Sequence, residues 1–159
     1  MLRLRKGLSI FLIGLIIEII GVETKIIFGH YDYGRGLGLK IFHTPLLIGL
    51  NWLFLVYTTS SILESYKIND IFKIFLGASM MLIYDLVLEQ VAPTMEMWTW
   101  KNDIVPIENY IVWFVLALFF HSLIKIFKVK TQNKLSFMVL VCQFLFFVVL
   151  FGIFKLTPR

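Results

Sequence analysis

The chain has 159 residues, of which 59% are hydrophobic, with a mean hydropathy of +0.86 and a formal net charge of +5. A soluble domain of this size is usually about half apolar, and here the apolar residues form long runs, which excludes an ordinary soluble domain. The basic residues lie between these runs, so no basic face is free of the membrane and nucleic-acid binding is not expected. We expect one integral membrane domain over residues 1–159.

Five apolar runs come close to the roughly 20 residues that a membrane-spanning helix needs. The fold class is therefore expected to be all-α, a polytopic membrane helical bundle. The connections between the runs are short, which predicts that consecutive helices are antiparallel neighbours. The predicted helices cover residues 8–28, 45–63, 71–88, 107–127 and 135–154.

The positive charges predict an orientation for these helices. Arg3, Arg5 and Lys6 precede the first run, which carries Glu18 and has no small-residue cleavage site, so it is expected to be an anchor and not a signal peptide. Nine Lys and Arg residues lie on the N-terminal side of the predicted bundle and six on the other side. The positive-inside rule then favours a cytoplasmic N-terminus, in a bacterial-type inner membrane.

The acidic residues have the opposite distribution, because eight of the ten are expected on the outer side. Glu18 lies about 15 Å along the first helix from Leu8, near the middle of the bilayer. Asp85 and Glu89 are four residues apart at the end of the third helix and share one helix face. An ionisable group at membrane depth is costly and is a functional-site hypothesis by default.

Amide and aromatic side chains are predicted at similar depths. Asn51 follows the start of the second helix, and Asn109 follows the start of the fourth, so with Glu18 and Asp85 they predict a polar pocket in the outer half of the membrane. Simpler interpretations stay open, since an Asn can bond a neighbouring helix and Trp and Tyr can form an interfacial belt. His121 is expected to be structural, because no side chain predicted at its level can pair with it.

Two ordered sets of residues resemble a known family. The first is Phe28-Gly-His-Tyr31-Asp-Tyr33-Gly, followed by Asn51-Trp52. The second is Asp85, Glu89, Trp98-Thr-Trp100, Pro106, Asn109-Tyr110 and Trp113. Together they are similar to the membrane carotenoid-biosynthesis proteins that include carotenoid 1,2-hydratases of the bisanhydrobacterioruberin hydratase type. The chain has Glu89-Gln90 where that pattern has Asp-Pro. Pro106-Ile-Glu-Asn109 also resembles the Pro-x-Glu-Glu motif of the small membrane lycopene cyclases.

The resemblance implies an acyclic carotenoid or related polyene as substrate and a hydro-lyase reaction without a cofactor or metal. Hydration begins with a proton delivered to carbon 2 of the terminal alkene, and water captures the cation at carbon 1. We expect Asp85 to be the general acid, with Glu18 or Glu89 orienting the water. The expected substrate-binding residues are Glu23, Tyr31, Tyr33, Asn51, Trp52, Trp98, Trp100, Asn109 and Trp113.

Other functions stay open at this point. Without water, an internal double bond captures the same cation, and the reaction becomes a lycopene-cyclase-like cyclisation. The same pocket would serve a polyene-binding protein without catalysis. A small transporter is a further alternative, although it would need polar groups through both halves of the membrane. The expected partners are the lipid bilayer and, beyond it, a second copy of the chain or other membrane enzymes of the carotenoid pathway.

Overall fold

The structure, a computed structural model, describes residues 2–157, with side chains from residue 7 onward. Five helices are long and apolar enough to cross a membrane, which confirms the expected all-α helical bundle. The first helix ends at Thr24 and not near residue 28, because Lys25 adopts a φ of 59°, which a continuing helix does not allow. The helices are α1 (Leu2–Thr24), α2 (Leu46–Glu64), α3 (Asp70–Val91), α4 (Ile107–Ile126) and α5 (Ser136–Leu156).

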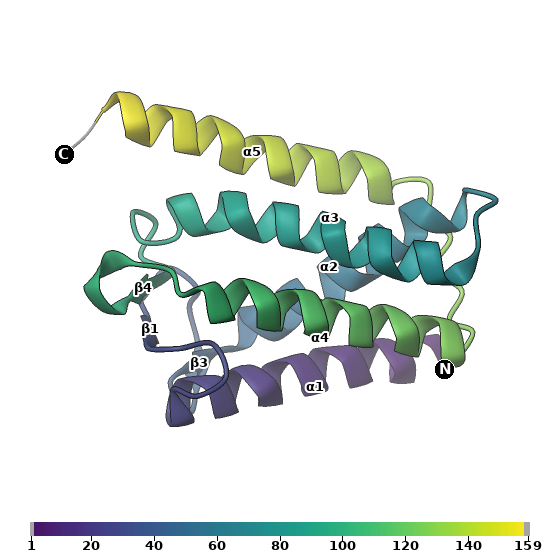
Figure 1. The fold of residues 1–159 in the computed structure, drawn as a ribbon, viewed down its shortest axis with the longest axis horizontal. Helices are drawn as coiled ribbons and strands as arrows, with labels where there is room; N and C mark the ends of the chain where they lie inside the picture. The colour runs from purple at the N-terminus through teal and green to yellow at the C-terminus, as the bar shows by residue number, and fades with distance from the viewer. Residues whose placement is uncertain (1, 158–159) are drawn as a thin grey trace.

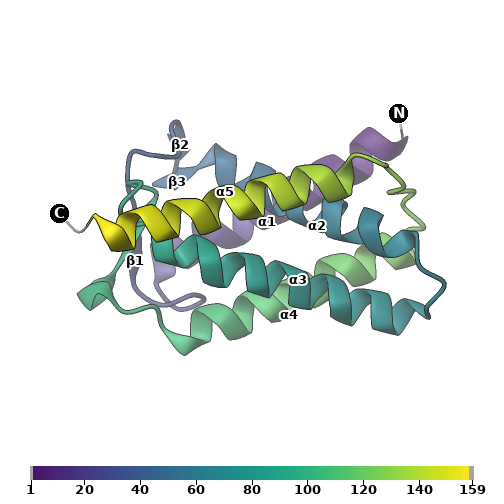
Figure 2. The ribbon, with the colours of Figure 1, turned by 90° about the horizontal axis from the view of Figure 1, so that it is seen from above.

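Consecutive helices run in opposite directions along the bundle (Figure 1). The closest pairs are α3 with α4 and α1 with α2, and α2 also contacts α3. The fifth helix departs from the expected pattern, because α5 packs on α2 and α3 and not mainly on α4 (Figure 2). Asn133 lies in the connection between α4 and α5, and its backbone N–H donates to the Ser61 hydroxyl of α2. This bond holds the connection against α2, and α5 begins on that side of the bundle.

Four short strands lie at the end of the bundle where the chain terminates, and the sequence did not predict them (Figure 1). Strand β2 (Lys40–Ile41) pairs with β3 (Thr44–Pro45) just before α2. Strand β1 (Tyr31–Tyr33) pairs antiparallel with β4 (Trp98–Trp100), although the two are far apart in the sequence. Alternate side chains of a strand point to the same face. The central residue of each strand is exposed, so the flanking residues, two tyrosines in β1 and two tryptophans in β4, point toward the helices.

The other end of the bundle is held by ion pairs between helices. The Lys125 ammonium lies 2.7 Å from a Glu64 carboxylate oxygen and 2.9 Å from one of Asp70. Closer to the middle, His121 is buried and its Nε2 lies 2.9 Å from the Thr59 hydroxyl. The expectation that nothing at this level could pair with His121 was therefore wrong, because a hydroxyl on α2 faces it across the bundle.

Candidate functional site

Glu18 is the centre of a hydrogen-bond network between α1, α2 and the β1 strand. Its side chain is buried, and its Oε1 accepts a 3.0 Å bond from the indole N–H of Trp52. Its Oε2 accepts from the hydroxyls of Tyr31 at 2.9 Å and Tyr33 at 2.8 Å. Trp52 can come this close to α1 because residue 14 is a glycine, whose added Cβ would lie 2.9 Å from the Trp52 side chain. Both oxygens of Glu18 are therefore occupied by donors.

The two tyrosines are permanent donors to Glu18. Burial raises the pKa of Tyr31 above its ordinary value, and the charge of Glu18 raises it further. The same two causes raise the pKa of Tyr33. Neither hydroxyl loses its proton in the physiological range, so each keeps the O–H that Glu18 accepts.

Glu89 is enclosed in the same manner by the β4 strand and α4. Its Oε2 accepts indole N–H bonds from Trp98 at 3.0 Å and Trp100 at 2.7 Å. Its Oε1 accepts a 3.2 Å bond from the Asn109 amide. Glu18 and Glu89 thus each accept three hydrogen bonds from neutral donors.

Asp85 has far fewer partners, although it is completely buried. It lies one turn before Glu89 on α3, and the Asn109 amide that bonds Glu89 reaches its Oδ2 at 3.5 Å, the long limit of a hydrogen bond. Its Oδ1 finds no hydrogen-bond partner among the described residues. None of the ion pairs seen between residues 7 and 157 involves Glu18, Asp85 or Glu89. We call these three residues the carboxyl cluster.

A small cavity of about 20 Å³ lies between Glu18 and Glu89. This volume has room for about one water molecule. Asn109 and Trp113 also line it, and Trp113 stacks on Trp52 with ring centroids 4.2 Å apart. The remaining lining residues are Phe28, Tyr31, Tyr33, Ile48, Trp98 and Trp100.

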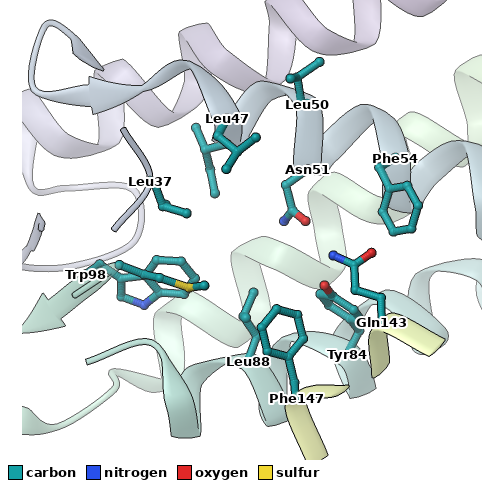
Figure 3. A pocket seen from close by; sticks show the side chains of 12 residues that line it. Leu37, Leu47, Leu50, Asn51, Phe54, Tyr84, Leu88, Trp98, Gln143 and Phe147 are labelled. Carbon is teal, nitrogen blue, oxygen red and sulfur yellow. The ribbon is translucent and has the colours of Figure 1, made fainter. Parts of the chain in front are cut away.

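A second, larger cavity of about 270 Å³ lies beside the first, between α2, α3 and α5 (Figure 3). Ile48 and Trp98 line both cavities, so these two side chains form the wall between them. Leu47 and Leu50 line the larger cavity and are about half exposed, which shows that it opens to the outside of the bundle. Its lining is mostly apolar.

Most of the residues expected at the site are brought together. Glu18 and Glu89 line the same small cavity, and Asp85 shares the Asn109 amide with Glu89. Seven of the nine expected substrate-binding residues surround them: Tyr31, Tyr33, Trp52, Trp98, Trp100, Asn109 and Trp113.

Two expected residues lie elsewhere. Glu23 does not support the carboxyl cluster, because its side chain is half exposed, lines neither cavity and pairs with His43 at 2.8 Å. Asn51 does not bond a carboxyl group either, since its amide points into the larger cavity (Figure 3). Two polar residues that line that cavity were not expected at the site, Tyr84 and Gln143. Gln143 carried a signal, as a polar side chain in the middle of the most apolar run.

The chemical character of the site is that of an acid–base centre. It consists of carboxyl groups, neutral N–H and O–H donors and aromatic rings. No group of three or more His, Cys, Asp or Glu side chains suited to a metal ion occurs among the described residues.

Comparison with known proteins agrees with this arrangement. A family model described as carotenoid biosynthesis protein matches residues 3–158. No curated protein and no solved structure matches the chain. The family match extends over nearly the whole sequence, including all five helices and both strands that enclose the carboxyl cluster, and the chain therefore belongs to the carotenoid biosynthesis protein family.

Proposed function

We propose that this protein hydrates the terminal double bond of an acyclic carotenoid, as a carotenoid 1,2-hydratase. Its family gives the role in carotenoid biosynthesis. The observation that carries the reaction is the unequal bonding of the carboxyl cluster around a cavity of one-water size. Two of its members have both carboxyl oxygens bonded by donors, and one oxygen of the third has no partner among the described residues.

The unequal hydrogen bonding supports different roles for the three carboxyl groups. An ionised carboxylate only accepts hydrogen bonds, and three donors each suit Glu18 and Glu89 to that form. None of the three carboxyl groups has a cation beside it within the described chain, but Asp85 alone has a single long hydrogen-bond contact, so its environment favours the neutral acid most strongly. Asp85 is therefore the proton donor, and Glu89 or Glu18 is the base.

The reaction then runs as an addition of water across the alkene. The Asp85 proton adds to carbon 2 and leaves a tertiary cation at carbon 1, which the indole face of Trp98 stabilises. A water between Glu18 and Glu89 bonds to carbon 1, and one of these carboxylates takes its extra proton. Return of that proton to Asp85 restores the starting state, and the Asn109 amide, which bonds both Asp85 and Glu89, holds the two groups in place.

The larger cavity supplies the place for the polyene. Its apolar lining and its opening beside Leu47 and Leu50 suit a hydrocarbon chain that arrives from the bilayer. Asp85 is not among the described residues that line either cavity. The end group of the substrate has to move lining side chains aside before the Asp85 proton can reach carbon 2.

We further propose that the N-terminus is cytoplasmic and that the whole chain is one membrane domain. Nine of the fifteen Lys and Arg residues support this orientation. The paired strands β1 and β4 lie at the opposite end of the bundle from the start of α1 (Figure 1), and their side chains bond Glu18 and Glu89 of the carboxyl cluster. The water for the reaction then comes from the outer side of the membrane.

Product mass tests the proposed reaction. The full chain is expressed in cells that accumulate lycopene or another acyclic carotenoid, and the extracted pigments are analysed by mass spectrometry. A gain of one water per reacting end supports hydration. An isomer of unchanged mass would show cyclisation by the same acid, and unaltered pigment bound to the purified protein would show a polyene-binding protein; either result contradicts a hydratase.

A further inference from the structure

We propose that the larger cavity is a binding site for a neutral oxygen, a hydroxyl or carbonyl, on the end of the polyene, and that Tyr84, Asn51 and Gln143 hold it. This inference rests on the proposed function for the identity of the ligand as a polyene. It adds a polar subsite to a cavity that is otherwise apolar, and it makes these three residues determinants of specificity.

The first evidence is a pair of buried polar groups without partners. Tyr84 is 3% exposed, and its hydroxyl has no hydrogen-bond partner in the described part of the chain. The Asn51 amide nitrogen is likewise buried and unpaired among residues 7–157. Buried polar groups are nearly always hydrogen-bonded in native proteins, and two such groups facing one cavity indicate a ligand that bonds them.

The second evidence is that the three side chains point inward from three different helices. Figure 3 shows the ends of Asn51 from α2, Tyr84 from α3 and Gln143 from α5 directed toward the middle of the cavity. Gln143 is a polar residue within a helix that is otherwise almost entirely apolar. Three convergent polar groups in an apolar cavity are typical of sites that fix the orientation of a ligand.

Tyr84 is also held in this direction by its neighbours. Its ring packs edge-on against Phe147 of α5, with centroids 5.9 Å apart and an interplanar angle of 87°. The ring of Phe144 also packs against Tyr84, with ring centroids 6.5 Å apart. The packing of α5 therefore keeps the hydroxyl directed into the cavity.

The chemistry of the lining selects the ligand class. No charged side chain lines the cavity within the described residues, so a phosphate or carboxylate is disfavoured. A lipid acyl chain or a pure hydrocarbon would leave Tyr84 and Asn51 unpaired. A molecule with one neutral oxygen and a long apolar body satisfies both requirements.

The position of the subsite relates the oxygen to the reaction. Only the side chains of Ile48 and Trp98 separate this cavity from the smaller one that Glu18 and Glu89 line, within the described residues. The oxygen is thus bound close to the reacting end of the polyene. It belongs either to a substrate that already carries oxygen near its terminal double bond or to the newly formed alcohol.

Binding by the full chain in lipid nanodiscs tests the subsite. Affinity is measured through quenching of tryptophan fluorescence for three polyenes of equal length: a hydrocarbon, an alcohol that keeps its terminal double bond, and the hydrated product. All measurements use the Asp85→Asn background, so that no turnover occurs. We expect at least one alcohol to bind more tightly than the hydrocarbon, and the tighter one identifies the source of the oxygen.

Two variants show whether the named residues are responsible. Tyr84→Phe should weaken binding of that alcohol about three- to tenfold, the effect of one hydrogen bond, and leave hydrocarbon binding unchanged. Gln143→Leu should act in the same direction. Tyr57→Phe is the matched control, because Tyr57 lies on α2 outside the cavity lining and its variant should match the parent.

The results separate this inference from the proposed reaction. Equal weakening of hydrocarbon and alcohol by Tyr84→Phe, or no weakening of either, would overturn the subsite even if the protein hydrates carotenoids. Selective weakening of the alcohol would support the subsite even if product analysis shows no gain of water.

Discussion

Replacing Asp85 with Asn tests the assignment of the acid most directly, because the structure predicts separate effects on rate and stability. The variant has nearly the same shape but no acidic proton. Oδ1 of Asp85 has no partner among the described residues, and its other oxygen has a single contact at 3.5 Å from Asn109. No strong hydrogen bond is broken, so the free energy of unfolding should change by no more than about 1 kcal/mol.

The rate should fall far more than the stability. General acid catalysis is typically worth about 10²–10⁴-fold, which corresponds to about 3–5 kcal/mol in activation free energy. The assay measures initial rates of product formation by liquid chromatography with mass detection, together with polyene binding and the amount of protein in the membrane. We expect normal insertion and binding with little or no product.

Glu23→Gln is the matched control for this experiment. Glu23 is an acidic residue in the last turn of α1, the helix that also carries Glu18. It is half exposed and pairs with His43, so its variant should keep the wild-type rate. A wild-type rate in Asp85→Asn would refute the reasoning. Asp85 would then be structural, and the acid would have to be Glu89 or Glu18.

Three further predictions concern the network, the packing and the orientation. Glu18→Gln should lower the free energy of unfolding by about 1–3 kcal/mol, because an amide cannot accept at both positions where Glu18 receives its three donors; an unchanged thermal unfolding temperature in detergent would contradict this. Gly77→Ala should destabilise by a similar amount, about 1–3 kcal/mol, since its Cβ would meet the His121 ring, whereas Gly152→Ala, with open space around it, should be neutral. A periplasm-dependent reporter fused after the last residue should be active, and activity of a cytoplasm-dependent reporter at that position would reverse the proposed orientation.

The network around Glu18 could not be predicted from the sequence, because its donors are distant along the chain. Tyr31 and Tyr33 were expected to bind substrate, yet both donate directly to Glu18. Their position depends on the pairing of β1 with β4. This pairing joins two loops that are separated in the sequence by the helices α2 and α3. Nothing local in either loop specifies its partner strand.

Asn51 and Trp52 show how neighbouring residues separate in the folded chain. Both were expected to serve one pocket, but adjacent positions on a helix point in different directions. Trp52 therefore bonds Glu18, and Asn51 faces the larger cavity on the other side of α2. The rotation of α2 about its axis relative to α1 decides which of the two side chains faces the carboxyl cluster. Gly14 of α1 permits the close approach of Trp52.

The sequence by itself determined the five helices and the pairing of Asp85 with Glu89 on one face. In lipid, every backbone polar group has to be satisfied within its own segment, so about 20 apolar residues are enough to define a helix, and a spacing of four residues places two side chains one above the other. The tertiary structure alone decided that α5 packs on α2 and α3 and closes the larger cavity. The apolar surface of α5 suits lipid and protein equally. Its position depends on contacts between segments, such as Phe147 with Tyr84 and Asn133 with Ser61, which no single segment specifies.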